Sequence, residues 1–200
     1  MTKVLVFAGS ARSESLNKKL ARLAADAVMA AGGSATFIDL DDYPMPLYHG
    51  DLETREGVPA KTLELAELIR AHDALLIVSP ENNASVSSLL KNTIDWLSRL
   101  PEYGALKGKT AALAAASPGA FGGVRGLYHL RAILNTLGVE VIAQQFVLAS
   151  AHQAFDVEGR LADAKQQAAL AALAARLVVA VAPRDGAQVT TASGKRAARR

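Results

Sequence analysis

The chain has 200 residues, of which half are apolar and a fifth are charged, and this composition is typical of one globular domain. It contains no cysteine, which excludes disulfides, thiolate metal sites and cysteine nucleophiles. No run of about 18 uncharged apolar residues and no signal-peptide pattern is found, so we expect no membrane span and a cytoplasmic location.

The net charge of +3 is distributed unevenly along the chain. Residues 183–200 carry five basic residues against one acidic residue, which leaves the remainder at about −1. This tail is rich in Gly, Ala, Ser and Thr, as is typical of disorder. A basic arm for nucleic acid or an anionic surface is the alternative, but the tail has no interleaved aromatic residues, so no nucleic-acid partner is expected. We therefore predict a folded domain over 1–182 and a disordered tail over 183–200.

Apolar strand patterns alternate with helical patterns along the whole domain. Strands are predicted at 4–8, 35–40, 74–78, 110–116 and 139–142. Helices are predicted at about 16–31, 60–71, 86–100, 124–137 and 161–181, with a long irregular segment at 41–59. This alternation predicts an α/β fold in which helices cover both faces of a five-stranded parallel sheet.

The segment from Gly9 to Asn17 joins the first predicted strand to the first helix. Such a loop collects unpaired backbone N–H groups and the positive end of the helix dipole. Ser10, Arg12, Ser15 and Asn17 add hydroxyl, guanidinium and amide donors, which indicates a phosphate site. The loop lacks both the P-loop ending and the three-glycine dinucleotide spacing, so a monophosphate fits best. Plain N-capping is the alternative, but it accounts for one serine only.

Two further polar loops follow the third and fourth predicted strands, at 79–85 and 117–125. Either one alone is also explained as a tight βα turn. In a parallel sheet, however, all three loops open at the carboxyl edge of the strands, where ligands bind. Their convergence predicts one binding site at that edge.

Three motifs occur in order: Gly-Ser-x-Arg-x-x-Ser-x-Asn at 9–17; Ser-Pro-Glu at 79–81, with Leu-Lys-Asn-Thr-Ile-Asp-Trp at 90–96; and Ser-Pro-Gly at 117–119, followed by Gly-Gly at 122–123. With them, the chain resembles the NAD(P)H-dependent FMN reductase family over about residues 3–180. Quinone, azo-dye and chromate reductases are relatives in that family.

The resemblance implies a flavodoxin-like three-layer sandwich with strand order 2-1-3-4-5. It implies FMN as cofactor, NADPH or NADH as co-substrate, a small electron acceptor such as a quinone, a flavin or an azo compound, and a homodimer or tetramer. By the family pattern, the FMN phosphate would lie on Ser10, Arg12, Ser15 and Asn17. The flavin ring would be flanked by Pro80, Glu81, Asn82, Asn83, Ser85, Ser117, Gly119, Gly122 and Gly123. This chemistry requires no side-chain acid or base, so no catalytic residue is assigned.

The chain departs from the family pattern at Asn82, where a tyrosine against the flavin is usual, and at Ser87-Ser88, where Pro-Gly is common. Loss of a stacking aromatic costs about 1–3 kcal/mol, which weakens binding roughly 5- to 150-fold. Two alternatives to an NAD(P)H-dependent reductase therefore remain open. One is a non-enzymatic FMN electron carrier, although carriers are usually strongly acidic. The other is a family member with weakened flavin binding and a regulatory role.

Smaller signals complete the pattern. The four histidines lack metal-ligand spacing, so no metal is expected. Trp96 and Leu97 fit either a buried core or a dimer seam. Tyr48, His49 and Gly50, in the long irregular segment, are candidates to wall a partner subunit's pocket.

Overall fold

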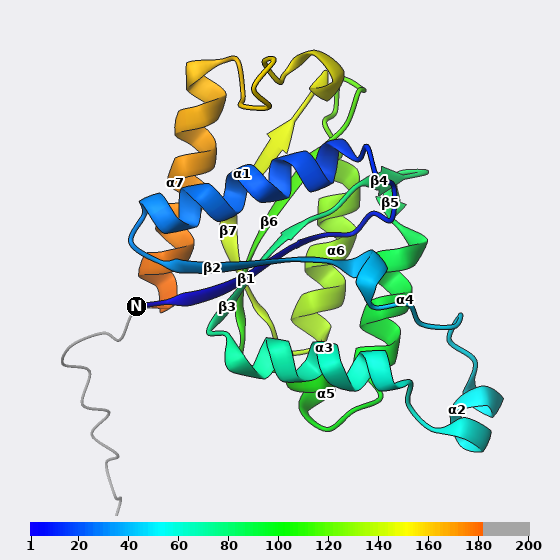
Figure 1. The fold of residues 1–200 in the computed structure, drawn as a ribbon. Helices are drawn as coiled ribbons and strands as arrows, with labels where there is room; N and C mark the ends of the chain where they lie inside the picture. The colour runs from blue at the N-terminus through cyan, green and yellow to red at the C-terminus, as the bar shows by residue number, and fades with distance from the viewer. Residues whose placement is uncertain (182–200) are drawn as a thin grey trace, which may run out of the picture.

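Five apolar runs form one parallel sheet in the computed structural model, which describes residues 1–181 (Figure 1). The strands are β1 (Lys3–Ala8), β2 (Ser34–Asp39), β3 (Ala74–Val78), β6 (Thr110–Ala116) and β7 (Glu140–Leu148). Their order is β2-β1-β3-β6-β7, and each neighbouring pair is parallel. The predicted order 2-1-3-4-5 of the five main strands is therefore confirmed. The basic tail at 183–200 lies outside the described residues.

Helices cover both faces of the sheet (Figure 1). One face is covered by α1 (Leu16–Ala30) and α7 (Ala164–Val181), and the other by α3 (Ala60–Ala71), α4 (Ser88–Leu97) and α6 (Val124–Thr136). Side chains of a strand alternate between faces. In β1, Val4 and Val6 accordingly pack on the α1 side, whereas Leu5 and Phe7 pack on the α4 side. The sheet is buried on both faces, as its continuous apolar strands predicted.

Helix α7 has the length and composition of a membrane-spanning helix. Its leucines at 170, 173 and 177 are nevertheless buried in the core beside α1. It begins at Ala164, three residues later than predicted, because Leu161 is buried in an isolated β-bridge with Phe155.

Several short elements differ from the predictions. Helix α2 (Gly50–Glu56) forms inside the segment predicted to be irregular; it buries none of its residues, so it has no apolar periodicity to reveal it. A two-stranded hairpin, β4 (Glu81–Asn82) and β5 (Ser85–Val86), occupies the predicted polar loop. The remaining short elements are η1 (Leu40–Asp42), η2 (Ala151–Gln153) and α5 (Glu102–Ala105), a single turn with left-handed backbone angles. Strand β7 was predicted to end at residue 142, but it continues through the polar Gln144-Gln145 stretch to Leu148.

The segment at 43–58 forms an arm that projects beside α4 (Figure 1). The Trp96 indole donates a hydrogen bond to the Pro46 carbonyl at 2.7 Å, and the Tyr48 ring meets Trp96 edge-on with centroids 5.1 Å apart. Trp96 is fully buried within the single chain, which confirms its core role over the dimer seam.

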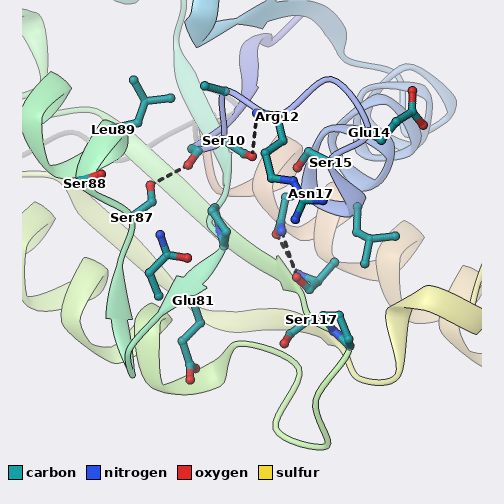
Figure 2. A pocket seen from close by; sticks show the side chains of 17 residues that line it. Ser10, Arg12, Glu14, Ser15, Asn17, Glu81, Ser87, Ser88, Leu89 and Ser117 are labelled. Atoms are coloured by element: carbon teal, nitrogen blue, oxygen red, sulfur yellow. Dashed lines mark hydrogen bonds between the residues drawn. The ribbon is translucent and has the colours of Figure 1, made fainter.

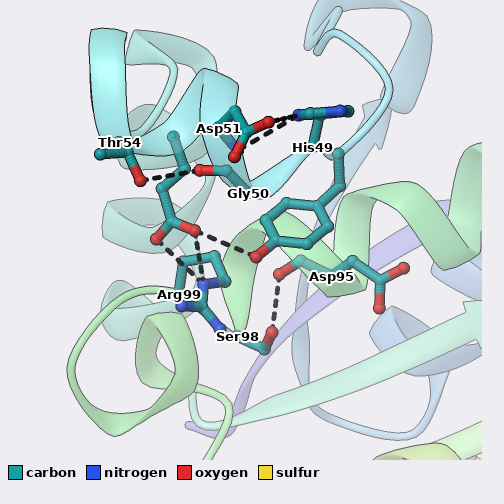
Figure 3. A network of polar contacts seen from close by, with 9 residues as sticks. His49, Gly50, Asp51, Thr54, Asp95, Ser98 and Arg99 are labelled. Atoms are coloured by element: carbon teal, nitrogen blue, oxygen red, sulfur yellow. Dashed lines mark hydrogen bonds and ion pairs between the residues drawn. The ribbon is translucent and has the colours of Figure 1, made fainter.

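A polar network fixes the outer part of the arm (Figure 3). The Glu53 carboxylate accepts hydrogen bonds from the Arg99 guanidinium at 2.9 Å and from the Tyr48 hydroxyl at 3.0 Å. The bond from Arg99 is the main cause that holds the pKa of Glu53 below its usual value. The arm is therefore joined to the end of α4 by polar contacts, although α2 itself buries no residue.

Candidate cofactor site

A cavity of about 450 Å³ lies at the carboxyl edge of the sheet, beyond β1, β3 and β6. Its walls are the β1–α1 loop, the hairpin that follows β3, the first turn of α4 and the start of the β6–α6 loop (Figure 2). The three loops predicted to converge therefore do meet at one site. Eight of the thirteen predicted residues line the cavity: Ser10, Arg12, Ser15, Asn17, Pro80, Glu81, Asn82 and Ser117.

The β1–α1 loop is fixed at its start by Gly9. The Gly9 N–H donates to the Val78 carbonyl at 2.9 Å, and the Gly9 carbonyl accepts from the Ser87 hydroxyl at 2.6 Å. A Cβ at position 9 would lie 2.9 Å from the Leu90 Cβ, so only glycine allows this contact with α4. The loop thus enters the site at a position set by β3 and α4.

The donors of this loop surround the N-terminus of α1. Ser15 is the N-cap, and its hydroxyl accepts from the Lys18 N–H at 3.3 Å. The first backbone N–H groups of a helix have no partner within the helix and form the positive end of its dipole, and Leu16 and Asn17 of this first turn line the cavity. Among the described residues, the Arg12 guanidinium has no hydrogen-bond or ion-pair partner, and it lines the same cavity (Figure 2). A cation, hydroxyls and a helix N-terminus are the groups from which anion sites in proteins are built.

Asn17 has a structural task in addition to its place in the cavity. Its Nδ2 donates to the Ala116 carbonyl, and its Oδ1 accepts from the Ala116 N–H, both at 2.9 Å. Since Asn17 is buried, this pair joins the first turn of α1 to the end of β6. The amide therefore holds two walls of the site together.

Glu81 is one of the residues that line the cavity, but its carboxylate is bound to α6. It accepts hydrogen bonds from the N–H groups of Arg125 and Gly126 and from the Arg125 guanidinium. Burial alone would raise the pKa of Glu81, but these bonds outweigh it and lower the pKa. The side chain is ionised at neutral pH.

The tip of the hairpin is a two-residue turn in which both Asn83 and Ala84 have positive φ, as a type I′ turn requires. Asn83 and Ser85 line a neighbouring groove of about 720 Å³ rather than the main cavity, and Asn82 lines both. Ser85 is also within 2.9 Å of the His129 ring. The hairpin therefore separates the main cavity from the neighbouring groove.

The predicted glycines of the β6–α6 loop do not line the main cavity. Gly119 and Gly122 form a tight turn, in which the Gly122 N–H donates to the Gly119 carbonyl at 3.1 Å. Gly123 has a φ of 94°, and a Cβ there would lie 2.8 Å from that of Ala115. These glycines shape the loop that carries Ser117.

The predicted site residues did not include Ser87, Ser88 and Leu89, which also line the cavity. Ser87 is the N-cap of α4, and its hydroxyl accepts from the Leu90 N–H at 3.2 Å. A serine directly before an apolar helical pattern is an N-cap signal. This signal in the sequence could have indicated that Ser87 begins α4 at the wall of the cavity. Within residues 1–181, no group of His, Asp and Glu side chains is arranged to hold a metal ion.

The chain is similar in sequence to known proteins. The family model described as NADPH-dependent FMN reductase matches residues 2–153. An NAD(P)H-dependent FMN reductase of Pseudomonas aeruginosa is 42% identical over 164 residues, which cover 82% of this chain and 86% of the relative. A quinone reductase of Escherichia coli is 42% identical over 143 residues, which cover 70% of this chain and 73% of the relative.

A solved structure has the same fold as this chain. FerB, a flavoenzyme NAD(P)H:(acceptor) oxidoreductase from Paracoccus denitrificans, superimposes with a TM-score of 0.75 at 28% identity. The alignment covers 90% of this chain and 96% of FerB. The fold is flavodoxin-like, and the named relatives are enzymes. The chain therefore belongs to the NADPH-dependent FMN reductase family and is an NAD(P)H-dependent oxidoreductase with FMN as its cofactor.

Proposed function

We propose that the cavity at the carboxyl edge of the sheet holds FMN, with its phosphate on the β1–α1 loop. The observation that carries this proposal is the Arg12 guanidinium, which lines the cavity beside the N-terminus of α1 without a partner among residues 1–181. The hydroxyls of Ser10 and Ser15 lie in the same wall. This donor set fits a dianionic monophosphate in charge and in hydrogen-bonding capacity.

The ring of the cofactor then lies toward the hairpin and the β6–α6 loop. Pro80 and Asn82 line the cavity on one side and Ser117 on the other. When bound there, FMN would supply the hydride- and electron-transfer chemistry, which the protein's side chains lack. The protein's task is to bind and orient the ring and to leave one face open. Asn82, which is short and exposed, leaves more space over the ring than an aromatic side chain would.

We propose a small planar acceptor of the quinone class. The support is the quinone reductases among the relatives, together with a cavity that Asn82 leaves open beside the adjoining groove. The test is NAD(P)H oxidation with menadione, with and without added FMN. Turnover that depends on both FMN and menadione supports the proposal. Oxidation at the same rate without menadione contradicts it.

We also propose a homodimer or tetramer in the cytoplasm. The support is the arm, which the Glu53–Arg99 ion pair joins to the end of α4 and on which Leu47 is 81% exposed. This projecting arm would contact a second copy, where His49 and Gly50 would wall the partner's pocket; Tyr48, predicted with them, instead has its side chain against Trp96 and Glu53. Sedimentation equilibrium tests this proposal. A monomer at micromolar concentration contradicts it, and Leu47→Asp should dissociate the oligomer.

A further inference from the structure

Helix α6 is capped by a side chain from another loop. Its N-cap residue, Gly123, has no side chain to offer. The Glu81 Oε2 instead accepts from the Arg125 N–H at 3.0 Å and from the Gly126 N–H at 3.2 Å. These are first-turn N–H groups that need a partner from outside the helix. A carboxylate there also neutralises the positive end of the helix dipole.

The same carboxylate holds the Arg125 side chain. Its Oε1 accepts from the Arg125 Nε at 2.8 Å, and the guanidinium lies over the Phe121 ring, 5.2 Å from its centroid. The Glu81 side chain is only 7% exposed, whereas that of Arg125 is 53% exposed. The buried member of the pair therefore determines where the exposed member lies.

The Glu81 side chain points away from the phosphate donors, toward α6, although Glu81 is one of the residues that line the cavity (Figure 2). The hairpin rests closely on α6, since a Cβ at Gly126 would lie 3.0 Å from the Ser85 carbonyl oxygen. One carboxylate thus joins the hairpin, the start of α6 and the Phe121 turn. The hairpin and the β6–α6 loop, which holds the Phe121 turn, are the two segments toward which the proposed function places the flavin ring.

We propose that Glu81 is a positioning residue for FMN, which acts through α6 and Arg125 and not by contact with the cofactor. It fixes the hairpin to the β6–α6 loop, so that the ring side of the cavity is formed before FMN binds. It also cancels the positive charge of Arg125 and of the α6 N-terminus beside the ring. This inference rests on the proposed placement of FMN.

The test is Glu81→Gln, with FMN titrated into apo-protein by fluorescence and the midpoint potential of the bound flavin measured. Loss of charge-assisted hydrogen bonds to a preformed wall should weaken FMN binding about tenfold or more. The midpoint potential should rise, because an uncompensated positive charge near the ring favours the electron-rich form. Arg125→Met should shift the potential in the opposite direction, because it leaves the Glu81 charge unbalanced. A merely structural role produces no such opposite shifts.

Asp156→Asn is the matched control. Asp156 also accepts from two backbone N–H groups, those of Glu158 and Arg160, and from the Arg160 Nε, but it lines a separate cavity. This variant should lose stability without a change in FMN affinity or potential.

Three outcomes are decisive. If wild-type protein does not bind FMN, the proposed function fails. If it binds FMN but Glu81→Gln matches it in affinity and potential, the positioning role fails. If Glu81→Gln does not fold, Arg125→Met decides alone: a lowered potential supports the inference, and an unchanged potential overturns it.

Discussion

Asn17→Ala removes the two hydrogen bonds that join α1 to the end of β6. The Ala116 N–H and carbonyl then lose their partners in a buried place, and each unsatisfied group costs about 1–3 kcal/mol. Because the cavity lies beside them, water solvates part of the loss, and we expect a decrease of about 2–4 kcal/mol in the free energy of unfolding. That is a large share of the roughly 5–15 kcal/mol that is typical of a domain.

Urea denaturation of apo-protein measures this change, and Asn135→Ala is the control, since Asn135 is an exposed asparagine of α6. Asn17→Asp sharpens the test, because it keeps the acceptor but places a second oxygen against the Ala116 carbonyl. Repulsion and burial should raise the folded-state pKa of that new carboxyl group, so the stability of Asn17→Asp should recover as the pH falls. If Asn17→Ala changes the free energy of unfolding by less than about 0.5 kcal/mol, the scale of a neutral surface substitution, Asn17 does not join α1 to β6 in the way described.

Three further outcomes follow from the hairpin. Asn82→Tyr should tighten FMN binding roughly 5- to 150-fold in a fluorescence titration, because it places an aromatic side chain against the ring. Unchanged affinity would contradict the proposed position of residue 82 beside the flavin ring. Ala84→Gly should stabilise the protein by about 0.5–1 kcal/mol in urea denaturation, because φ is +63° at this position, and a loss of stability would contradict the type I′ turn. Since the folded-state pKa of Glu81 is lowered, its contribution to stability is complete above the unfolded pKa of about 4.3 and is lost as the pH falls through the lower folded value. The difference in unfolding free energy between wild type and Glu81→Gln should therefore shrink below about pH 4, and a constant difference down to pH 2 would count against it.

The fold could be predicted from the sequence because its strong signals are periodic. The run at Val4–Ala8 and the leucines of α1 and α7 belong to elements that bury large apolar faces, and burial imposes the pattern. Helix α2 and the β4–β5 hairpin bury little or are very short, so they carry no such pattern. The short, one-turn elements were missed for the same reason.

The location of the site could be predicted from the sequence, but most of the contacts within it could not. The loops after β1, β3 and β6 do meet, because topology alone brings strand ends together. The tasks of Asn17 and Glu81 depend on partners far along the chain, the Ala116 backbone and the start of α6. Local sequence identifies a donor or an acceptor but not its distant partner, so these tasks appear only in three dimensions.

The central claim is that the β1–α1 loop holds the FMN phosphate, and the comparison of FMN with riboflavin tests it most directly. Apo-protein is titrated with each ligand under the same conditions. We predict that FMN binds at least about tenfold more tightly than riboflavin, as charge-assisted hydrogen bonds to the phosphate require, and that Arg12→Ala reduces this preference. Equal affinity for the two ligands in the wild-type protein would contradict the account.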